Sequence, residues 1–158
     1  MRGGIFGSLS IAALGLCIGG AAAADTVVGG LAFPLDPQVW QAEGDRLVCR
    51  AQDCDGAAVR VSRVEAPCDD ALLASLAEAE TGRGGKGVRI LPARDLHLRV
   101  LIATSPCRSL SADPVFACVT VGGVTRLVTT ESARGHRCAM PLGAPARVLD
   151  LLGRAGKP

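Results

Sequence analysis

The segment Glu131 to Arg137 concentrates the side chains of this chain that are best suited to chemistry. Its candidate binding residues are Ser132, Arg134, His136 and Arg137. Two guanidinium groups can bind a carboxylate or a phosphate bidentately, and an imidazole adds a contact that strengthens as the pH falls through about 6.5. We therefore predict a binding surface here, held in place by Cys138. An ordinary solvated connection is the alternative.

A hydrolase is a second interpretation of the same segment. His136 would act as the base for Ser132, together with a distant Asp. However, no GxSxG motif precedes the histidine. The other histidine, His97, lies between Asp95 and Arg99 on the polar face of a predicted strand, where a solvated imidazole is expected. We therefore assign no catalytic residue.

Other patterns that resemble ligand sites fail at defined positions. The stretch GRGGKG over 82–87 follows a helix instead of opening one, and its Lys is followed by Gly, so a solvated loop is expected instead of a phosphate loop. Asp53 and Asp55 resemble part of a calcium loop, but the first and last ligand positions would be Ala51 and Ser62. There is no CxxC or CxxCH motif. The sequence thus predicts no metal and no cofactor.

The cysteines predict a disulfide-stapled protein. Seven are present, of which Cys17 lies in the N-terminal apolar stretch. The remaining six are Cys49, Cys54, Cys68, Cys107, Cys118 and Cys138. An even number in an exported chain indicates three disulfides, but the sequence does not choose among the possible connectivities. The pair we favour is Cys107 with Cys118, which would close a short loop.

Residues 1–24 have the features of a cleaved signal peptide. Arg2 precedes the uncharged stretch Ile5 to Gly20, and four alanines lead to Asp25, where the mature protein would begin. A membrane anchor is the alternative, but the run is rich in glycine. Acylation of Cys17 is disfavoured by the large Leu16 before it. We predict a single exported domain over 25–158, with no transmembrane segment after cleavage.

The composition of the chain excludes some classes of partner but does not identify a particular one. The mature part keeps sixteen Lys and Arg against fifteen Asp and Glu, a net charge of +1. Three aromatic residues remain, too few for the stacking that nucleic acids require. The chain has no Asn and hence no N-glycosylation site, which favours a bacterial periplasmic or secreted protein. Another periplasmic protein or a small anionic ligand is the expected partner.

The elements that position these residues are predicted from periodicity and turn signals. The expected strands are an edge strand over 26–33, then 46–51, 57–64, 88–91, 95–103, 115–121 and 124–130. Gly122-Gly123 gives the clearest hairpin, and Asp55-Gly56 gives a second one. Helical spacing over 69–82 places Leu72, Leu73, Leu76 and Ala79 on one face, with Asp69 as the N-cap. Gly82 is expected to adopt the left-handed conformation that ends this helix. A short helix begins near Pro145.

These elements predict an α+β fold. It would have an antiparallel sheet of five or six short strands, one helix packed on a face, a short C-terminal helix, and disulfide staples. The function that the sequence favours is a non-enzymatic binding or accessory protein of the periplasm. The small exported hydrolase and a structural component of the cell envelope are the alternatives.

Overall fold

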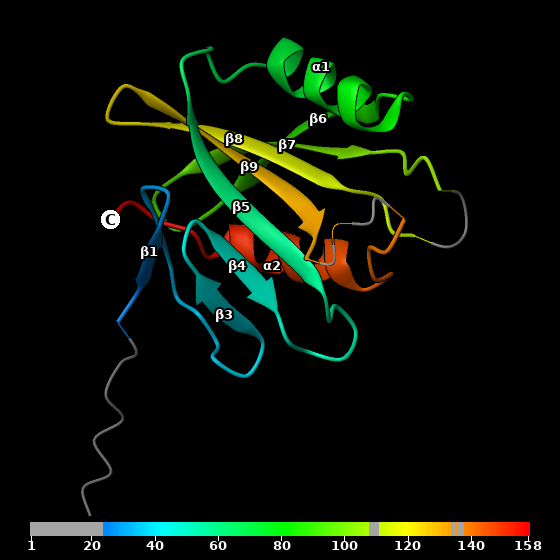
Figure 1. Ribbon diagram of the computed structural model, residues 1–158. Coiled ribbons are helices and arrows are strands. Elements are labelled where there is room, and N and C mark those ends of the chain that lie inside the picture. Colours follow the sequence, from blue (N-terminus) through cyan, green and yellow to red (C-terminus); the bar gives the residue numbers. More distant parts are fainter. Residues whose placement is uncertain (1–23, 108–110, 134, 136–137) are drawn as a thin grey trace, which may run out of the picture.

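An antiparallel sheet of seven strands forms the centre of the computed structural model, which describes residues 24–107, 111–133, 135 and 138–158. In spatial order its strands are β3 (Trp40–Glu43), β4 (Arg46–Cys49), β5 (Ala57–Val64), β9 (Val124–Ser132), β8 (Val115–Val121), β7 (His97–Ala103) and β6 (Gly85–Pro92). A separate hairpin contains β1 (Thr26–Val28) and β2 (Leu31–Phe33), and the helices are α1 (Asp70–Thr81) and α2 (Ala144–Gly153). The predicted α+β class is confirmed (Figure 1).

The predicted number of strands is too low. The main sheet has seven strands instead of five or six, and the separate hairpin brings the described strands to nine. Compared with the seven segments expected from the sequence, two strands are added because the segment 26–33 is a hairpin and Trp40 begins a further strand. These elements have only three or four residues each, too few to show an alternating pattern in the sequence. Gly29 and Gly30 suggest a break in a strand, but they form the turn of the hairpin, with φ of 57° and 84°.

The sheet is built from two meanders joined by α1. The first runs through β3, β4 and β5, and the second runs through β6, β7, β8 and β9. Between them, α1 crosses to the far edge of the sheet, so that β9 returns to pair with β5 over eight residues. Both predicted hairpins are confirmed by the pairings of β4 with β5 and of β8 with β9.

Each face of the sheet packs against a different helix (Figure 1). On the α2 face, Leu98 and Val100 of β7 contact the larger core, which includes Val148 and Leu152. On the α1 face, the alternate residues of the same strands form a smaller core with Leu73, Ala77, Leu101, Phe116 and Leu127. Both faces of β7 are therefore apolar toward its end, which alternation alone does not predict.

Helix α1 has the predicted ends. Asp69 accepts a hydrogen bond from the backbone N–H of Leu72 at 2.8 Å, and Gly82 adopts the left-handed conformation with φ of 68°. The buried face differs slightly from the prediction, because Ala77 is buried and Ala79 is exposed. No helix in the described ranges is long and apolar enough to cross a bilayer.

The glycine-rich stretch 82–87 is only partly a loop. Strand β6 already begins at Gly85, which pairs with Ala103 of β7. A Cβ atom at Gly85 would lie 2.8 Å from side-chain atoms of Leu101, so any larger residue would have to displace this buried side chain. The prediction of a solvated loop is therefore wrong for its second half.

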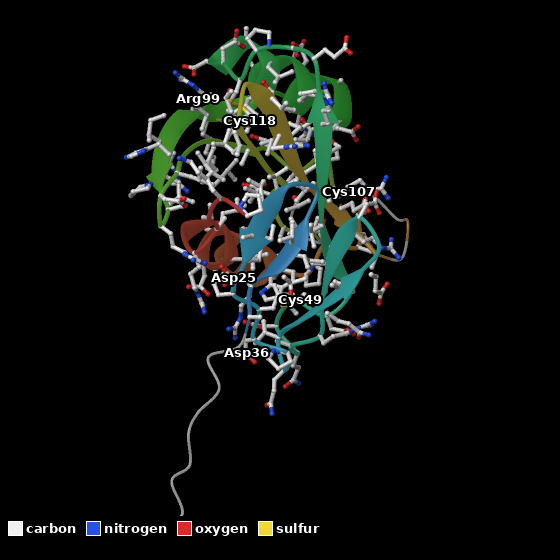
Figure 2. The ribbon with its side chains drawn as sticks, turned by 90° about the vertical axis from the view of Figure 1, so that its left-hand side faces the viewer. Asp25, Asp36, Cys49, Arg99, Cys107 and Cys118 are labelled. Carbon is white, nitrogen blue, oxygen red and sulfur yellow. A yellow bond between two sulfur atoms is a disulfide. The ribbon has the colours of Figure 1, made fainter. Side chains whose placement is uncertain are left out.

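Three disulfides connect the six cysteines, as predicted, but the expected pairing of Cys107 with Cys118 is wrong. The bonds are Cys49–Cys54, Cys68–Cys118 and Cys107–Cys138. Cys118 is the fourth residue of β8, so the strand carries it about 10 Å from the loop that precedes Val115. It lies directly beside Arg99 of β7, close to the start of α1 (Figure 2).

Candidate functional site

A half-open cavity of about 280 Å³ lies on the α1 face, where β9 ends and β8 begins. Helix α1 and described residues of the β7–β8 and β9–α2 loops also contribute to its wall. Its apolar lining residues are Leu76, Pro106, Ala112, Pro114, Phe116 and Met140. Its polar lining residues are Glu80, Thr81, Ser105, Thr129, Thr130, Glu131 and Ser132, together with Gly135.

Most hydroxyl groups of this lining are held by the backbone. The Thr81 hydroxyl donates to the carbonyl of Ala77 at 2.7 Å. Thr130 accepts from the N–H of Val115 at 2.8 Å and lies 3.1 Å from the carbonyl of the same residue. Ser105 accepts from the N–H of Cys107 at 3.2 Å. These bonds fix the side chains, so the shape of the cavity is largely formed before any ligand binds.

The two loops beside the cavity are joined to each other. The Cys107–Cys138 disulfide links them covalently. In addition, the N–H of Ala112 donates to the carbonyl of Met140 at 3.0 Å, and the N–H of Met140 donates to the Ser111 hydroxyl at 3.2 Å. A covalent bond with two hydrogen bonds restrains both loops, although they come from distant parts of the sequence.

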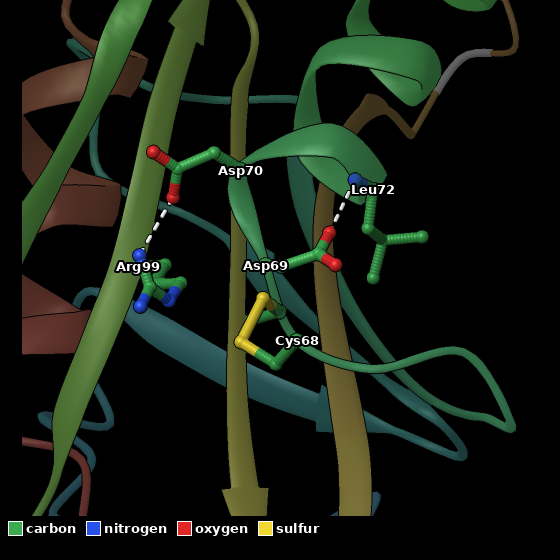
Figure 3. The surroundings of a disulfide bond; sticks show 6 residues. Cys68, Asp69, Asp70, Leu72 and Arg99 are labelled. Carbon is green, nitrogen blue, oxygen red and sulfur yellow. Dashed lines mark hydrogen bonds and ion pairs between the residues drawn. A yellow bond between two sulfur atoms is a disulfide. The ribbon is translucent and has the colours of Figure 1, made fainter.

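Helix α1 is fixed at its N-terminal end (Figure 3). Cys68, just before the helix, is bonded to Cys118 of β8, and Asp70 forms an ion pair of 2.6 Å with Arg99 of β7. The N-cap Asp69 lies between these two anchors. The opposite end of the helix, with Glu80 and Thr81, borders the cavity.

The described rim carries acidic charge. Glu131 lies 3.3 Å from Arg60 and 3.9 Å from Arg46, so two guanidinium groups on neighbouring strands position its carboxylate. Glu80 is exposed and has no ion pair within the described ranges. No Lys or Arg belongs to the described lining. The described lining therefore offers hydrogen-bond acceptors beside an apolar floor.

The structure places part of the predicted binding segment at this cavity. Ser132 is the last residue of β9 and belongs to the lining, as does Gly135. Arg134, His136 and Arg137 lie outside the described residues, so their roles stay predictions. The hydrolase interpretation, which requires His136 close to Ser132, also stays a prediction.

Other residues considered from the sequence have structural explanations. His97 is exposed at the start of β7. Asp53 forms an ion pair of 2.8 Å with Arg147, which joins the β4–β5 loop to α2. Gly56 adopts a positive φ of 83° in that loop, as a turn requires. Within the described ranges, no group of three or more His, Cys, Asp or Glu side chains is arranged to hold a metal ion.

Comparison with known proteins gives no relationship: no family model, no curated protein and no solved structure matches the chain. Its function must therefore be argued from geometry and chemistry.

Sequence reasoning missed the cavity as a whole. Its floor combines Leu76 of α1, Phe116 of β8 and Met140 of a loop, and each of these residues reads as an ordinary core residue in its own segment. One signal was available, because Cys107 and Cys138 flank the two loops that line the cavity. Knowing that these two cysteines pair would have placed the loops side by side.

Proposed function

We propose that the chain is an exported, non-enzymatic binding protein whose cavity accepts one apolar side chain of a protein partner. The observation that carries this proposal is the half-open cavity of about 280 Å³ with an apolar floor and a polar rim. Polar and apolar side chains line the cavity in similar numbers, and in a binding site the apolar part supplies affinity while the polar part fixes orientation.

The size of the cavity favours an anchor residue over a complete small molecule. Sites for drug-sized ligands span about 300–1,000 Å³, so a cavity of about 280 Å³ is at or below the lower limit. A single Leu, Met or Phe side chain suits this space. Apolar anchors that fill a central pocket contribute a large share of the affinity in many protein interfaces.

The acidic side chains at the rim of the cavity favour a partner that has hydrogen-bond donors next to its apolar anchor residue. The carboxylates of Glu80 and Glu131 and the nearby hydroxyl oxygens accept hydrogen bonds. Backbone N–H groups or a Lys or Arg next to the apolar anchor would complement them. Glu131 is paired with Arg60 and Arg46, but Glu80 has no ion pair within the described ranges and would repel an anionic ligand, so we expect a protein partner at this cavity.

The expected export of the chain would place its partner outside the cytoplasm. Three disulfides fit an oxidising compartment. The N-terminal residues 1–23 lie outside the described part of the chain, and cleavage before Asp25 is an expectation from their sequence. We therefore propose a bacterial periplasmic or secreted location, with another exported protein as the partner.

Site-specific photo-crosslinking tests this proposal. The photoreactive residue p-benzoylphenylalanine would replace Glu80, at the cavity rim, and in a matched control Glu78, which is exposed on the same helix but does not line the cavity. In cells that export the protein, irradiation should give a protein adduct of defined mass from position 80 and none from position 78. Equal adducts from both positions, or none from either, would refute the proposal.

A pair of tryptophan variants tests whether the cavity itself makes the contact. Leu76→Trp should fill part of the cavity and remove the adduct formed from position 80. Ala74→Trp adds the same side chain to an exposed position of α1 and should leave the adduct unchanged. An adduct that survives Leu76→Trp would place the partner on the helix surface instead.

A further inference from the structure

Two arginines face each other across β5 and β9 on the α2 face of the sheet. Arg63 and Arg126 are direct register partners. Arg126 is two residues before the core residue Val128, and Arg63 is two residues after the core residue Val61. The Cβ atoms of directly opposed residues are about 5 Å apart, and like charges in this position destabilise a sheet. The presence of two arginines at directly opposed positions therefore requires an explanation.

Neither guanidinium is neutralised within the described part of the chain. Arg63 and Arg126 form no ion pair there, and Glu65, the acid nearest to Arg63 in the sequence, is paired with neither of them. By contrast, the α1 face carries three arginines that are each paired with an acid: Arg46, Arg60 and Arg99. Arg89 on β6 is also unpaired, but Arg63 and Arg126 are the unpaired arginines of the described sheet that are register partners, and a bound anion would explain them.

The β1–β2 turn holds the guanidinium of Arg126 in position. A Cβ atom at Gly30 would lie 2.7 Å from Cζ of Arg126, so the backbone of the turn passes directly over this group. Nε of Arg126 is buried there and has no hydrogen-bond partner. The residue as a whole is half-buried, and its Nη2 also lies against the turn, since a Cβ atom at Gly30 would be 2.7 Å from it. An arginine that is fixed in this way loses little entropy when it binds a ligand.

We propose that Arg63 and Arg126 form a binding site for a phosphate group. Because Arg63 and Arg126 are register partners, two positive charges and several N–H donors extend from Cβ atoms about 5 Å apart, which suits the charge and the acceptors of a phosphate. Arg63 is exposed and borders an open groove beside the β5–α1 connection, so an anion can reach Arg63 from solvent. The site lies on the opposite face from the cavity, and it does not depend on the function proposed above.

Inorganic phosphate is the first probe. Nitrogen-15 spectra of the arginine Nε–H groups would be recorded on the exported protein during a titration with sodium phosphate, at an ionic strength held constant with sodium chloride. The resonances of Arg63 and Arg126 should shift along a saturable curve. Phosphate should also raise the melting temperature, because a ligand that binds only the folded state stabilises it.

Three variants separate a specific site from general attraction. Arg63→Gln should weaken phosphate binding by about tenfold or more, and Arg126→Lys, which keeps the charge but removes the planar group, should weaken it by several-fold. Arg89→Gln removes one charge from an exposed position on β6 and should change the affinity by less than about twofold. Because Arg63 is exposed, Arg63→Gln tests the proposal even if Arg126→Lys fails to fold.

A lipid headgroup and a free phosphate are distinguished by a vesicle experiment. If the natural ligand is a lipid, vesicles of phosphatidylglycerol in phosphatidylcholine should sediment the protein, whereas pure phosphatidylcholine should not, and Arg63→Gln should abolish sedimentation. If only inorganic phosphate binds, the ligand is a free anion. The absence of saturable binding in both experiments, or an equal loss in Arg63→Gln and Arg89→Gln, would overturn the proposal.

Discussion

Replacing both Cys68 and Cys118 with alanine should cost far more stability than replacing both Cys49 and Cys54. The first disulfide joins residues 50 positions apart, and the second joins residues only five apart. In the chain-entropy model a crosslink stabilises by restricting the unfolded chain, and its effect grows with the logarithm of loop length. The free energy of unfolding should therefore fall by about 4 kcal/mol for the long loop and about 2 kcal/mol for the short loop.

The burial of these cysteines makes the two double variants comparable. Cys118, Cys49 and Cys54 are all 0% exposed and Cys68 is half-buried, so alanine removes similar packing at three of the four sites and less at Cys68. Replacing both partners of a bond leaves no free thiol that could form a new disulfide. The different loop lengths should then account for most of the difference between the two double variants.

Urea unfolding at 25 °C, followed by tryptophan fluorescence and circular dichroism, measures both effects. Linear extrapolation gives the free energy of unfolding, and the slope m should rise most when the long loop is opened, because the unfolded chain then expands further. If the Cys49/Cys54 double variant loses as much stability as the Cys68/Cys118 double variant, loop closure is not the main source of disulfide stabilisation in this protein.

Three further predictions concern the local structure and the export of the chain. Asp69→Ala should lower the free energy of unfolding by about 1 kcal/mol through loss of the N-cap bond, measured in urea, whereas Asp70→Ala removes only an exposed ion pair and should cost less. Gly29→Ala should destabilise the protein by about 2 kcal/mol more than Gly122→Ala, measured by thermal unfolding. The backbone strain is matched, because φ is 57° at Gly29 and 56° at Gly122. Only at Gly29 would the added Cβ atom lie 2.5 Å from a backbone oxygen. Equal losses from the two glycine variants would contradict this reading of the turn. Mass spectrometry of the exported protein should show an N-terminus at Asp25. Reduction of the three disulfides should add the mass of six hydrogens. Cysteines that are alkylated before reduction would contradict full pairing.

The sequence was most informative where a structure depends on neighbouring residues. The N-cap Asp69, the left-handed Gly82 and the Gly122-Gly123 turn were all predicted, because each acts within a few residues of its own position. The short hairpin over 26–33 was missed, since strands of three residues carry too little pattern to be recognised. The partner of Cys107 was predicted wrongly because closeness in sequence is a poor guide once a strand carries the chain away.

The sequence by itself determined an α+β chain with an export signal as its expected leader, an even set of cysteines in the remainder, and most of the hairpins and helix ends. Only the tertiary structure decided which cysteines pair, which loops lie beside the end of α1, and that Arg63 and Arg126 face each other across two strands. The physical reason is that helix caps and turns are fixed by interactions within a few residues. The cavity and the arginine pair instead depend on segments about 30 to 60 residues apart, which meet only when β9 returns to pair with β5.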